Sequence, residues 1–490
     1  MLTLLWFDQD LRLDDNPALA AAAARGPVVP VYILDEAAPG PWAPGAAARW
    51  WLHGALAALG DELQARGTAL VLRRGAAAAV IDELLASTGA DAVYWNRRYE
   101  PWAMRRAEGI KGTLRQRGIE ARSFNAGLLS EPGRVLTQKG EPFRVFTPFW
   151  RALRAQGEWA PHAPAPARLV AAPRGVASDA LDDWHLRPSQ PDWANGLREH
   201  WQPGAAGAQA RLDAFVAGPI SAYTGQRNLP GTAGTSRLSP HLHAGEIGPR
   251  QVWRAACLAA APAGAARGRD PADDGGEGAT DGRQTYLAEI AWREFSYHLL
   301  FHFPQLPLEP LRPEFAAFPW DSDPAALRAW QRGRTGYPIV DAGMRELWHT
   351  GWMHNRVRMI VASFLVKDLL LDWRSGAEWF WDTLVDADLA SNAASWQWVA
   401  GCGADAAPYF RVFNPSLQGA KFDPDGAYVR HWVPELARLP AALLHAPWEA
   451  RPVDLAAAGV VLGRDYPAPM VDHAQARHRA LWAYEQIRKR

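Results

Sequence analysis

The feature that most constrains the fold is an alternation of short apolar runs with alanine-rich stretches over the first 130 residues. The apolar runs have the length and composition of buried parallel strands, and they are Leu2–Phe7, Val28–Leu34, Ala69–Leu72 and Ala92–Trp95. The stretches between them are expected to be helices, at Pro17–Ala24, Ala46–Arg66 and Ala76–Ser87. This alternation predicts a doubly wound, parallel-sheet α/β domain of Rossmann-like type over residues 1–130. A dinucleotide fingerprint is absent, because the first apolar run is followed by Asp8-Gln9-Asp10 and not by G-x-G-x-x-G.

Two further regions follow along the chain. Residues 131–204 are rich in Pro, Ala and Gly, which predicts an interdomain linker on the surface. Residues 205–490 have mostly helical patterning, which predicts a large all-α domain. Within that domain, the low-complexity stretch Ala261–Gly282 is expected to be a loop.

Composition excludes several classes of protein. Lys plus Arg and Asp plus Glu are both 52, so the chain is neutral, which argues against general coating of nucleic acid but permits a local basic patch. The two cysteines, Cys257 and Cys402, cannot form a disulfide framework or a four-thiolate metal site, and a reducing cytoplasm is the simplest location. No metal site, signal peptide or membrane span is expected. Most of the 25 tryptophans are expected in the core, and some are available for stacking or electron transfer.

The first segment that can carry chemistry runs from Gly234 to His241. Ser239 before Pro240 is a suitable N-cap with proline at the first helical position. Free N–H groups together with the hydroxyls and the guanidinium ahead of it suit a phosphate or diphosphate. An ordinary capped helix with a solvated arginine explains the segment at least as well when it is taken alone.

A second segment places Glu289, Trp292 and Arg293 on one face of a helix, at positions i, i+3 and i+4. A carboxylate, an indole and a guanidinium together are a costly set to bury without a functional reason. The alternative is an exposed ion pair beside a packed tryptophan, and in isolation that alternative is favoured.

A third segment places Asn355, Arg358 and Met359 on one helical face. An amide, a charged fork and a polarizable thioether suit a heteroaromatic ligand such as a flavin or a nucleobase. The alternatives are core filling for Met359 and a solvated charge for Arg356.

The fourth segment, Asp386 to Trp398, combines small residues with polar ones in a tryptophan-rich setting. Small residues let a planar ligand approach the backbone. Asp386 is suited to pairing with an arginine, Asp388 can accept hydrogen bonds, and Asn392 and Trp396 stand one helical turn apart. A tight acidic loop is the alternative.

Together these segments resemble the photolyase/cryptochrome family. The blocks WREF, TGYPIVDAGMREL, GWMHNRVRMIVASFLVKDLL and DADLASNAASWQW occur in the family's order, and the opening LLWFDQDLRLDDNPAL and the closing YPAPMVDHAQAR fit as well. The resemblance covers nearly the whole chain except the linker and the insert at 261–282. Several long ordered motifs are far more specific than any one short motif.

The resemblance implies that FAD is bound in the helical domain. The positions that match flavin-contacting positions of the family are Tyr223, Thr235, Ser236, Arg237, Leu238, Ser239, Tyr286, Glu289, Arg293, Asn355, Arg358, Asp386, Ala387, Asp388 and Asn392. Asn392 matches the residue that faces flavin N5. Trp396, Trp373 and Trp320 match the family's electron-relay tryptophans.

Within the family, the resemblance is greatest to bacterial photolyases that repair cyclobutane pyrimidine dimers, because Asn355 and Met359 match that branch. The (6-4) branch has a histidine in place of Asn355, and the iron–sulfur branch needs four cysteines. The implied catalytic residues are Glu289, Asn355 and Asn392. The implied contacts to a flipped dimer in damaged DNA are Arg227, Glu289, Trp292, Asn355, Arg356, Met359, Trp398 and Arg411. The enzyme is expected to be a cytoplasmic monomer that acts without a membrane.

Three alternatives to dimer repair remain open: a cryptochrome-type blue-light sensor, a (6-4) repair enzyme, and a non-photochemical nucleotide-binding protein. An antenna chromophore is also left open, either methenyltetrahydrofolate or 8-hydroxy-5-deazaflavin. Tyr99-Glu100 is followed by Pro101 and not by the Asn-Glu pair of enterobacterial folate-binding relatives. Arg49, Trp50 and Trp51 offer another mode of binding, or simply pack on the sheet.

Overall fold

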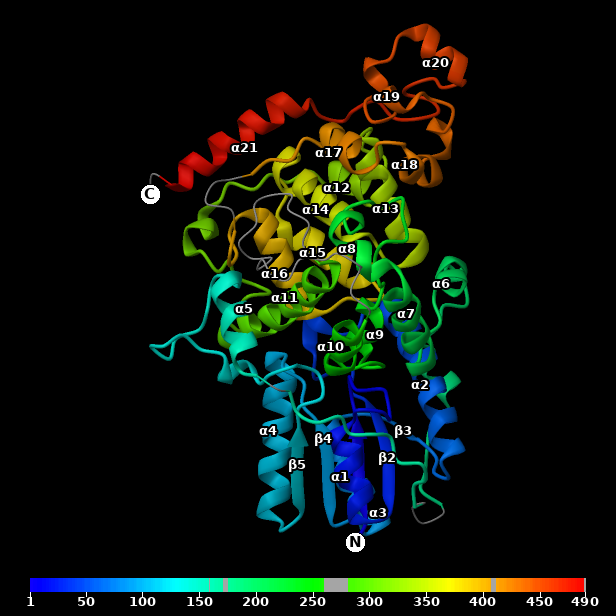
Figure 1. The fold of residues 1–490 in the computed structure, drawn as a ribbon, viewed down its shortest axis with the longest axis vertical. Helices are drawn as coiled ribbons and strands as arrows, with labels where there is room; N and C mark the ends of the chain where they lie inside the picture. The colour runs from blue at the N-terminus through cyan, green and yellow to red at the C-terminus, as the bar shows by residue number, and fades with distance from the viewer. Residues whose placement is uncertain (158, 171–174, 260–280, 407–410, 489–490) are drawn as a thin grey trace. The chain divides into compact units, whose positions relative to one another are not determined.

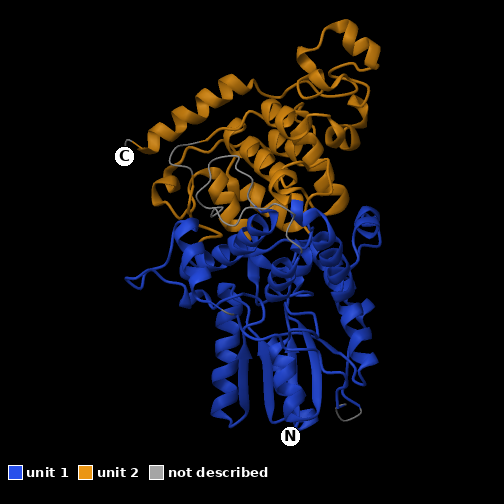
Figure 2. Ribbon diagram, viewed as in Figure 1, with its two compact units in different colours: residues 1–221, 236–304, 385–390 blue, residues 222–235, 305–384, 391–490 orange. Residues whose placement is uncertain are grey.

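The computed structural model describes the chain except residues 158, 171–174, 260–280, 407–410 and 489–490, so most of the predicted loop at 261–282 lies outside the described residues. Its contacts divide the chain into two units (Figure 2). Unit 1 comprises residues 1–221, 236–304 and 385–390, and unit 2 comprises residues 222–235, 305–384 and 391–490. The domain boundaries at residues 130 and 204 remain a prediction.

Unit 1 contains the predicted parallel sheet (Figure 1). Its strands are β1 (Thr3–Phe7), β2 (Val28–Leu34), β3 (Val71–Arg74), β4 (Ala92–Asn96) and β5 (Glu120–Phe124). They pair in the order β3-β2-β1-β4-β5, all parallel, which confirms the doubly wound α/β prediction. The third strand begins two residues later than predicted. The fifth strand was not predicted, because its sequence EARSF is half polar and only partly buried.

Four helices accompany these strands: α1 (Pro17–Arg25), α2 (Ala46–Ala65), α3 (Ala77–Thr88) and α4 (Pro101–Gln116). The start of α1 follows from its sequence, since Asn16 Oδ1 accepts a hydrogen bond from Leu19 N and Pro17 stands in the first turn. Apolar side chains of α3 and α4 pack with those of the central strands in one buried cluster that includes Trp6, Leu84 and Trp95. Burial of such large side chains supplies the main stabilisation of this layer.

The rest of unit 1 is helical. It contains η1 (Gly40–Trp42), η2 (Pro132–Arg134), α5 (Phe146–Ala155), η3 (Leu181–Trp184), α6 (Asn195–His200), α7 (Ala205–Ala217), α9 (Ser239–Ala244), α10 (Pro249–Leu258) and α11 (Gly282–His302). The predicted linker at 131–204 is more structured than its composition indicated, because it holds two helices and buries Phe149, Trp150 and Trp184.

Unit 2 is helical in its described residues, which confirms the predicted all-α character of this part. Its helices are α8 (Tyr223–Gln226), α12 (Pro324–Gln331), α13 (Pro338–Thr350), α14 (Asn355–Ser363), α15 (Trp373–Thr383), α16 (Leu389–Ala400, of which the first two residues belong to unit 1), α17 (Pro415–Phe422), α18 (Ala427–Trp432), α19 (Ala441–Leu444), α20 (Pro452–Ala458) and α21 (His473–Arg488). The short turns η5 (Pro313–Ala317) and η6 (Phe364–Asp368, a π-turn) connect them. None of the described helices is long and apolar enough to cross a membrane.

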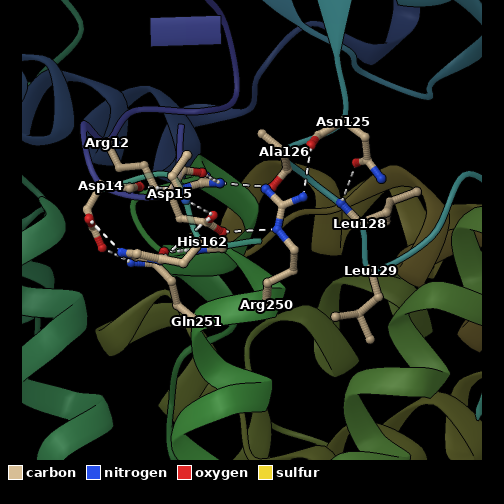
Figure 3. Close-up of polar contacts among 12 residues, drawn as sticks. Arg12, Asp14, Asp15, Asn125, Ala126, Leu128, Leu129, His162, Arg250 and Gln251 are labelled. Atoms are coloured by element: carbon tan, nitrogen blue, oxygen red, sulfur yellow. Dashed lines mark hydrogen bonds and ion pairs between the residues drawn. The ribbon is translucent and has the colours of Figure 1, made fainter. Parts of the chain in front are cut away.

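A buried arginine joins separate segments of unit 1 (Figure 3). The side chain of Arg12 is 1% exposed and donates hydrogen bonds to the carbonyl oxygens of Asp14, Asp15, Ala126 and Gly245, at 2.9 to 3.0 Å. These carbonyls belong to the turn after β1, the loop after β5 and the end of α9. Burial lowers the pKa of Arg12 to about 10, while the charge of Asp15 opposes that shift, so the guanidinium stays protonated at neutral pH.

Helix α10 reinforces the same turn (Figure 3). Arg250 Nε donates to Asp15 Oδ2 at 3.1 Å, and Gln251 Nε2 donates to Asp14 Oδ2 at 2.9 Å. Arg250 also donates to the Asn125 carbonyl at 3.2 Å. The turn after β1, the loop after β5 and the α9–α10 segment are therefore held by one hydrogen-bond network.

Replacing Arg12 by alanine is expected to lower the free energy of unfolding by about 3–5 kcal/mol, because four buried carbonyls lose their donor and Asp15 loses one of the positive charges near it. Urea denaturation at pH 7 measures the change. The control is Arg117→Ala, which removes an ion pair to Asp82 at the surface and is expected to cost less than about 1 kcal/mol. Equal costs for the two variants would contradict the role assigned to Arg12.

Candidate functional site

The segment before α9 carries the predicted phosphate-binding residues of unit 1. Arg237 has a positive φ of 51°, a backbone conformation that non-glycine residues adopt rarely and that is concentrated at functional sites. Ser236 Oγ accepts a hydrogen bond from the hydroxyl of Tyr286 at 3.1 Å, which joins the segment to α11. Tyr286 is buried, and burial raises the pKa of its hydroxyl, so it remains a donor.

The prediction that Ser239 is the N-cap is wrong by one residue. Leu238 occupies the N-cap position, and Ser239 is the first residue of α9. Leu238 has helix-like angles, φ −86° and ψ −4°, so the turn begins before the serine and no side chain caps it. The hydroxyl of Ser239 lies on an exposed residue.

Helix α11 carries four of the predicted residues, which confirms that Glu289, Trp292 and Arg293 share a helical segment. Glu289 and Arg293 are half-buried. Trp292 stacks on Phe146 of α5, with ring centroids 3.8 Å apart and planes within 7°, so one face of its indole is covered. Arg293 donates to the Gly127 carbonyl at 2.8 Å.

Asp388 is the most strongly perturbed carboxylate of the predicted set. It is buried and accepts a hydrogen bond from the Tyr297 hydroxyl, while His243 Nδ1 lies 3.7 Å from its Oδ2. Burial acts to raise the pKa of Asp388, but the interactions with His243, Arg293 and Tyr297 outweigh burial and hold the pKa well below its usual range. Asp388 is therefore an ionised hydrogen-bond acceptor at neutral pH, and its neighbours Asp386 and Ala387 are buried beside it in sequence.

In unit 2, α14 begins at the predicted lesion-contacting residues. Asn355 is exposed, and Arg356, Arg358 and Met359 are half-buried, so Met359 is not a core-filling residue. The fork of Arg356 donates to Asn228 Oδ1 at 2.7 and 3.2 Å and lies 4.4 Å from the ring centroid of Phe422. Arg356 is therefore positioned and is not simply a solvated charge.

The neighbouring side chains of unit 2 complete this description. Arg358 Nε donates to the Met353 carbonyl at 2.7 Å. Arg227 lies over the ring of Tyr223, 5.7 Å from its centroid, and Thr235 is half-buried. Trp398 is half-buried with its indole N–H donating to the Asp405 carbonyl at 3.2 Å. Arg411 is exposed, and its carbonyl accepts a hydrogen bond from Lys367.

Asn392 lies in α16, one turn before Trp396, as predicted. Its Nδ2 donates to the Ala377 carbonyl of α15 at 3.1 Å. The amide nitrogen is thus committed to the protein, which leaves Oδ1 as the atom suited to accept a hydrogen bond from a ligand N–H.

The three predicted relay tryptophans all lie in unit 2. Trp396 and Trp373 are fully buried, whereas Trp320 is half-buried. A Cβ on Gly376 would lie 2.1 Å from the Trp396 ring, so that ring lies against α15 one turn from Trp373. Asp321 N donates to the Leu370 carbonyl at 2.8 Å, which places Trp320 beside the segment that leads into α15. Because Trp396 and Trp373 are buried and Trp320 is half-buried, the three side chains suit an electron path from the interior of unit 2 to its surface.

Two groups near Asp388 were not singled out from the sequence, namely His243 and Tyr297. Tyr297 stands four residues after Arg293, so the i, i+4 spacing was an available signal. His243 gave no such signal, because it reaches Asp388 across a long sequence separation.

Trp51 has a packing role in unit 1. It is buried between Trp201 and His241, with ring centroids 5.5 and 5.0 Å away, and its indole N–H donates to Glu246 at 3.0 Å. Arg49 pairs with Glu36 at 2.7 Å. These contacts favour the structural alternative for Arg49 and Trp51 over antenna binding.

Comparisons with known proteins agree with these features. Residues 3–168 match the family model described as DNA photolyase, and residues 286–486 match the model of the FAD binding domain of DNA photolyase. The chain is 52% identical to a deoxyribodipyrimidine photo-lyase of Agrobacterium fabrum over 99% of this chain and 98% of that protein. It is 40% identical to Cryptochrome-1 of Arabidopsis thaliana over 98% of this chain and 70% of that protein.

A solved structure of a bacterial class III photolyase from Agrobacterium tumefaciens matches with a TM-score of 0.92 and 51% identity, covering 100% of this chain and 98% of that chain. The matches define a flavoprotein with an α/β part and a helical FAD-binding part. The chain belongs to the photolyase/cryptochrome family.

A buried carboxylate in α11 adds a titratable contact that the sequence did not predict. Glu294 Oε2 accepts from the backbone N–H groups of Leu129 and Ser130 at 2.9 and 3.3 Å, which ties the loop after β5 to α11. Burial raises the pKa of Glu294 to about 7, although Arg293 and the two N–H groups act in the opposite direction.

This contact predicts a pH dependence of stability. The folded-state pKa of Glu294 lies above its ordinary value of 4.5, so between those values the native protein holds a proton that the unfolded chain has lost. The free energy of unfolding is therefore expected to fall as pH rises from 4.5 to about 7, by on the order of 3 kcal/mol from this residue. Glu294→Gln removes the titrating group, and urea denaturation at several pH values is expected to show a flatter profile.

The control for this prediction is Glu83→Gln, at a carboxylate whose side chain is 60% exposed. It is expected to leave the pH profile of the wild type unchanged. Parallel profiles for Glu294→Gln and the wild type would contradict the assignment to Glu294.

Proposed function

We propose that the protein is a deoxyribodipyrimidine photo-lyase, a carbon–carbon lyase that repairs cyclobutane pyrimidine dimers in DNA with light. The observation that carries this proposal is Asn355, an exposed amide at the start of α14 beside the positioned Arg356 and the half-buried Met359. This set matches the dimer-repairing branch of the family. The 52% identity to a photo-lyase, against 40% to a cryptochrome, supports the same conclusion.

The cofactor is FAD, and the donor groups described above fit it. The residues that would hold it are Tyr223, Thr235, Ser236, Arg237, Leu238, Ser239, Tyr286, Glu289, Arg293, Asn355, Arg358, Asp386, Ala387, Asp388 and Asn392. Hydroxyls and the guanidinium of Arg237 suit the diphosphate. The ionised Asp388 suits a hydroxyl or ring N–H, and Asn392 Oδ1 suits a ring N–H. When bound, FAD supplies the electron that opens the dimer and recovers it afterwards.

Damaged DNA is the partner, and the dimer is expected to be flipped out of the duplex, because a lesion is already poorly stacked. Arg227, Arg356 and Arg411 would hold phosphates, and these local charges let a neutral chain bind DNA. Trp292 and Trp398 would contact the dimer rings together with Met359. The uncovered face of Trp292 is the one available for stacking, because Phe146 occupies the other.

Glu289 and Asn355 would hydrogen-bond the edges of the dimer. Glu289 would also share a proton with the dimer while the dimer carries the added electron. Asn392 would be the third catalytic residue, because its amide would orient the cofactor.

Trp396, Trp373 and Trp320 would carry electrons from the surface to the cofactor. Their burial supports this order, because Trp396 and Trp373 are enclosed and Trp320 reaches solvent. The relay serves reduction of the enzyme before repair and is not part of the repair step.

Several finer assignments belong to the same proposal. The enzyme would act as a monomer in the cytoplasm and away from membranes. An antenna chromophore, methenyltetrahydrofolate or 8-hydroxy-5-deazaflavin, would bind elsewhere than Trp51, whose indole is buried by protein.

A blue-light sensor without repair activity is the second candidate, because the chain is also 40% identical to Cryptochrome-1 of Arabidopsis thaliana. The test is to illuminate the chemically reduced enzyme with oligonucleotides that contain either a cyclobutane dimer or a (6-4) product. Light-dependent restoration of the cyclobutane dimer alone is the expected result. Failure on both substrates would leave the sensor, and repair of the (6-4) product alone would make the enzyme a member of that branch.

Asn355→Ala is expected to weaken binding of dimer-containing DNA about fivefold, because a hydrogen bond to the lesion contributes about 1 kcal/mol. Fluorescence anisotropy in the dark measures the dissociation constant. Asn195→Ala, at an exposed asparagine of α6, is the matched control and is expected to bind like the wild type. Unchanged affinity in Asn355→Ala would remove Asn355 from the lesion contacts.

Trp396→Phe is expected to abolish light-driven reduction of the oxidised enzyme, because phenylalanine cannot supply the first electron of the relay. Repair by enzyme that was reduced chemically beforehand is expected to persist. Trp330→Phe is the matched control, since Trp330 is as buried as Trp396 and its ring lies 6.3 Å from it. Photoreduction that survives in Trp396→Phe, or is lost equally in Trp330→Phe, would argue against the assigned relay.

A further inference from the structure

The first turn of α14, which carries Asn355 and Arg356, is held by the histidine that precedes it. His354 occupies the N-cap position, and its imidazole Nδ1 accepts a hydrogen bond from the backbone N–H of Arg356 at 3.2 Å. The carbonyl of His354 accepts from the N–H groups of Val357 at 2.9 Å and Arg358 at 3.0 Å. His354 therefore binds two N–H groups that the start of a helix cannot pair by itself, and it accepts the first regular bond of the helix.

An imidazole can cap a helix in only one protonation state. The usual N-cap residues are Ser, Thr, Asn and Asp, each of which offers an oxygen as acceptor. Histidine offers Nδ1 only when this nitrogen carries no proton, so the ring of His354 is neutral with its proton on Nε2. The imidazole is buried, and the ring of Trp352 meets it edge-on with centroids 6.2 Å apart. Packing therefore keeps the imidazole in its capping orientation.

A buried carboxylate of α13 holds the backbone of the same histidine. Glu346 Oε2 accepts a hydrogen bond from the His354 backbone N–H at 3.2 Å. The same oxygen accepts from the hydroxyl of Tyr428 in α18 at 2.7 Å, and the backbone N–H of Tyr428 donates to Asp423 Oδ1 at 2.9 Å. Helices α13 and α18 are therefore tied together at the residue before α14, which fixes where α14 begins.

The side chains that depend on this turn are those proposed to contact DNA. Asn355 is the first residue of α14 and is exposed, and Arg356 in the same turn is oriented by Asn228 and by the ring of Phe422. In a helix the direction of each side chain follows from the backbone of its turn. Fraying of the turn would let Asn355 sample other directions, and ordering it again would cost part of the free energy of DNA binding.

We propose that His354 is a positioning residue for recognition of the lesion, because its neutral imidazole keeps the first turn of α14 formed and Asn355 directed at the dimer. The inference rests on the proposed function, since Asn355 is the lesion contact through which His354 acts. His354 is buried behind the turn and acts by ordering the contact residue before DNA binds, without touching the lesion itself.

The test compares dissociation constants of the FAD-loaded enzyme for dimer-containing and undamaged oligonucleotides, measured in the dark by fluorescence anisotropy. His354→Ala removes the acceptor and is expected to weaken dimer binding about fivefold, because loss of an N-cap changes helix stability by about that factor. His354→Asn is expected to bind like the wild type, because Asn Oδ1 replaces Nδ1 as the acceptor. His354→Gln keeps a polar side chain that is not a preferred cap and is expected to match His354→Ala, so it serves if the alanine variant loses FAD.

A double variant tests whether His354 acts through Asn355. With both replaced by alanine, dimer binding is expected to weaken about fivefold, and not about twenty-five-fold as for independent effects. The matched control is Asp323→Ala, which removes the N-cap of α12, where Asp323 accepts from the N–H groups of Ala325 and Ala326 at 2.9 Å. It is expected to lower the urea midpoint as His354→Ala does and to leave the affinity for the dimer unchanged.

The outcomes separate this inference from the proposed function. Wild-type affinity for the dimer in His354→Ala and His354→Gln would overturn the role of His354, and so would a His354→Asn variant as weak as His354→Ala. Independent effects in the double variant, or an equal loss of affinity in Asp323→Ala, would also overturn it. A wild type that binds dimer-containing and undamaged DNA equally would overturn the proposed function, and this inference with it.

Discussion

The structure of unit 1 depends on one buried guanidinium. Arg12 is enclosed, and its donors are used by carbonyls of the turn after β1, the loop after β5 and the end of α9. Burying a charge in this way is tolerable only when its donors are matched and a counter-charge is near, and Asp15 supplies that charge while also binding Arg250. Arg12 therefore holds the turn after β1, the loop after β5 and the end of α9 in position together.

The proposed site of unit 1 follows from that arrangement. The loop after β5 supplies the Gly127 carbonyl that receives Arg293 and the N–H groups that receive Glu294, so it sets the position of α11. Asp388 and Glu294 are both buried, but their surroundings shift the pKa values of the two carboxylates in opposite directions. At Asp388 the interactions with His243, Arg293 and Tyr297 outweigh burial and keep the carboxylate ionised, whereas at Glu294 burial outweighs Arg293 and the two N–H groups and raises the pKa to about 7. The first is suited to bind a ligand N–H or hydroxyl, and the second makes the support of α11 sensitive to pH.

Local sequence patterns predicted the features that depend on residues close together in the chain, namely strands, helices and side chains that share a helical segment. Four of the five strands and the helices between them were found from apolar runs, and the shared helical positions of Glu289 with Arg293 and of Asn355 with Met359 followed from spacing. The fifth strand was missed because EARSF lacks an apolar run, and its pairing with β4 supplies what its composition does not. The Ser239 cap failed because the chain turns at Leu238 first. Contacts over long separations, such as His243 with Asp388, have no local signature at all.

The tryptophans show the same limit most clearly. With 25 of them in the chain, no spacing separates a relay residue from a core residue, and only the family resemblance selected Trp320, Trp373 and Trp396. The structure adds a physical distinction, because Gly376 leaves room for the Trp396 ring against α15, and a side chain there would collide with it.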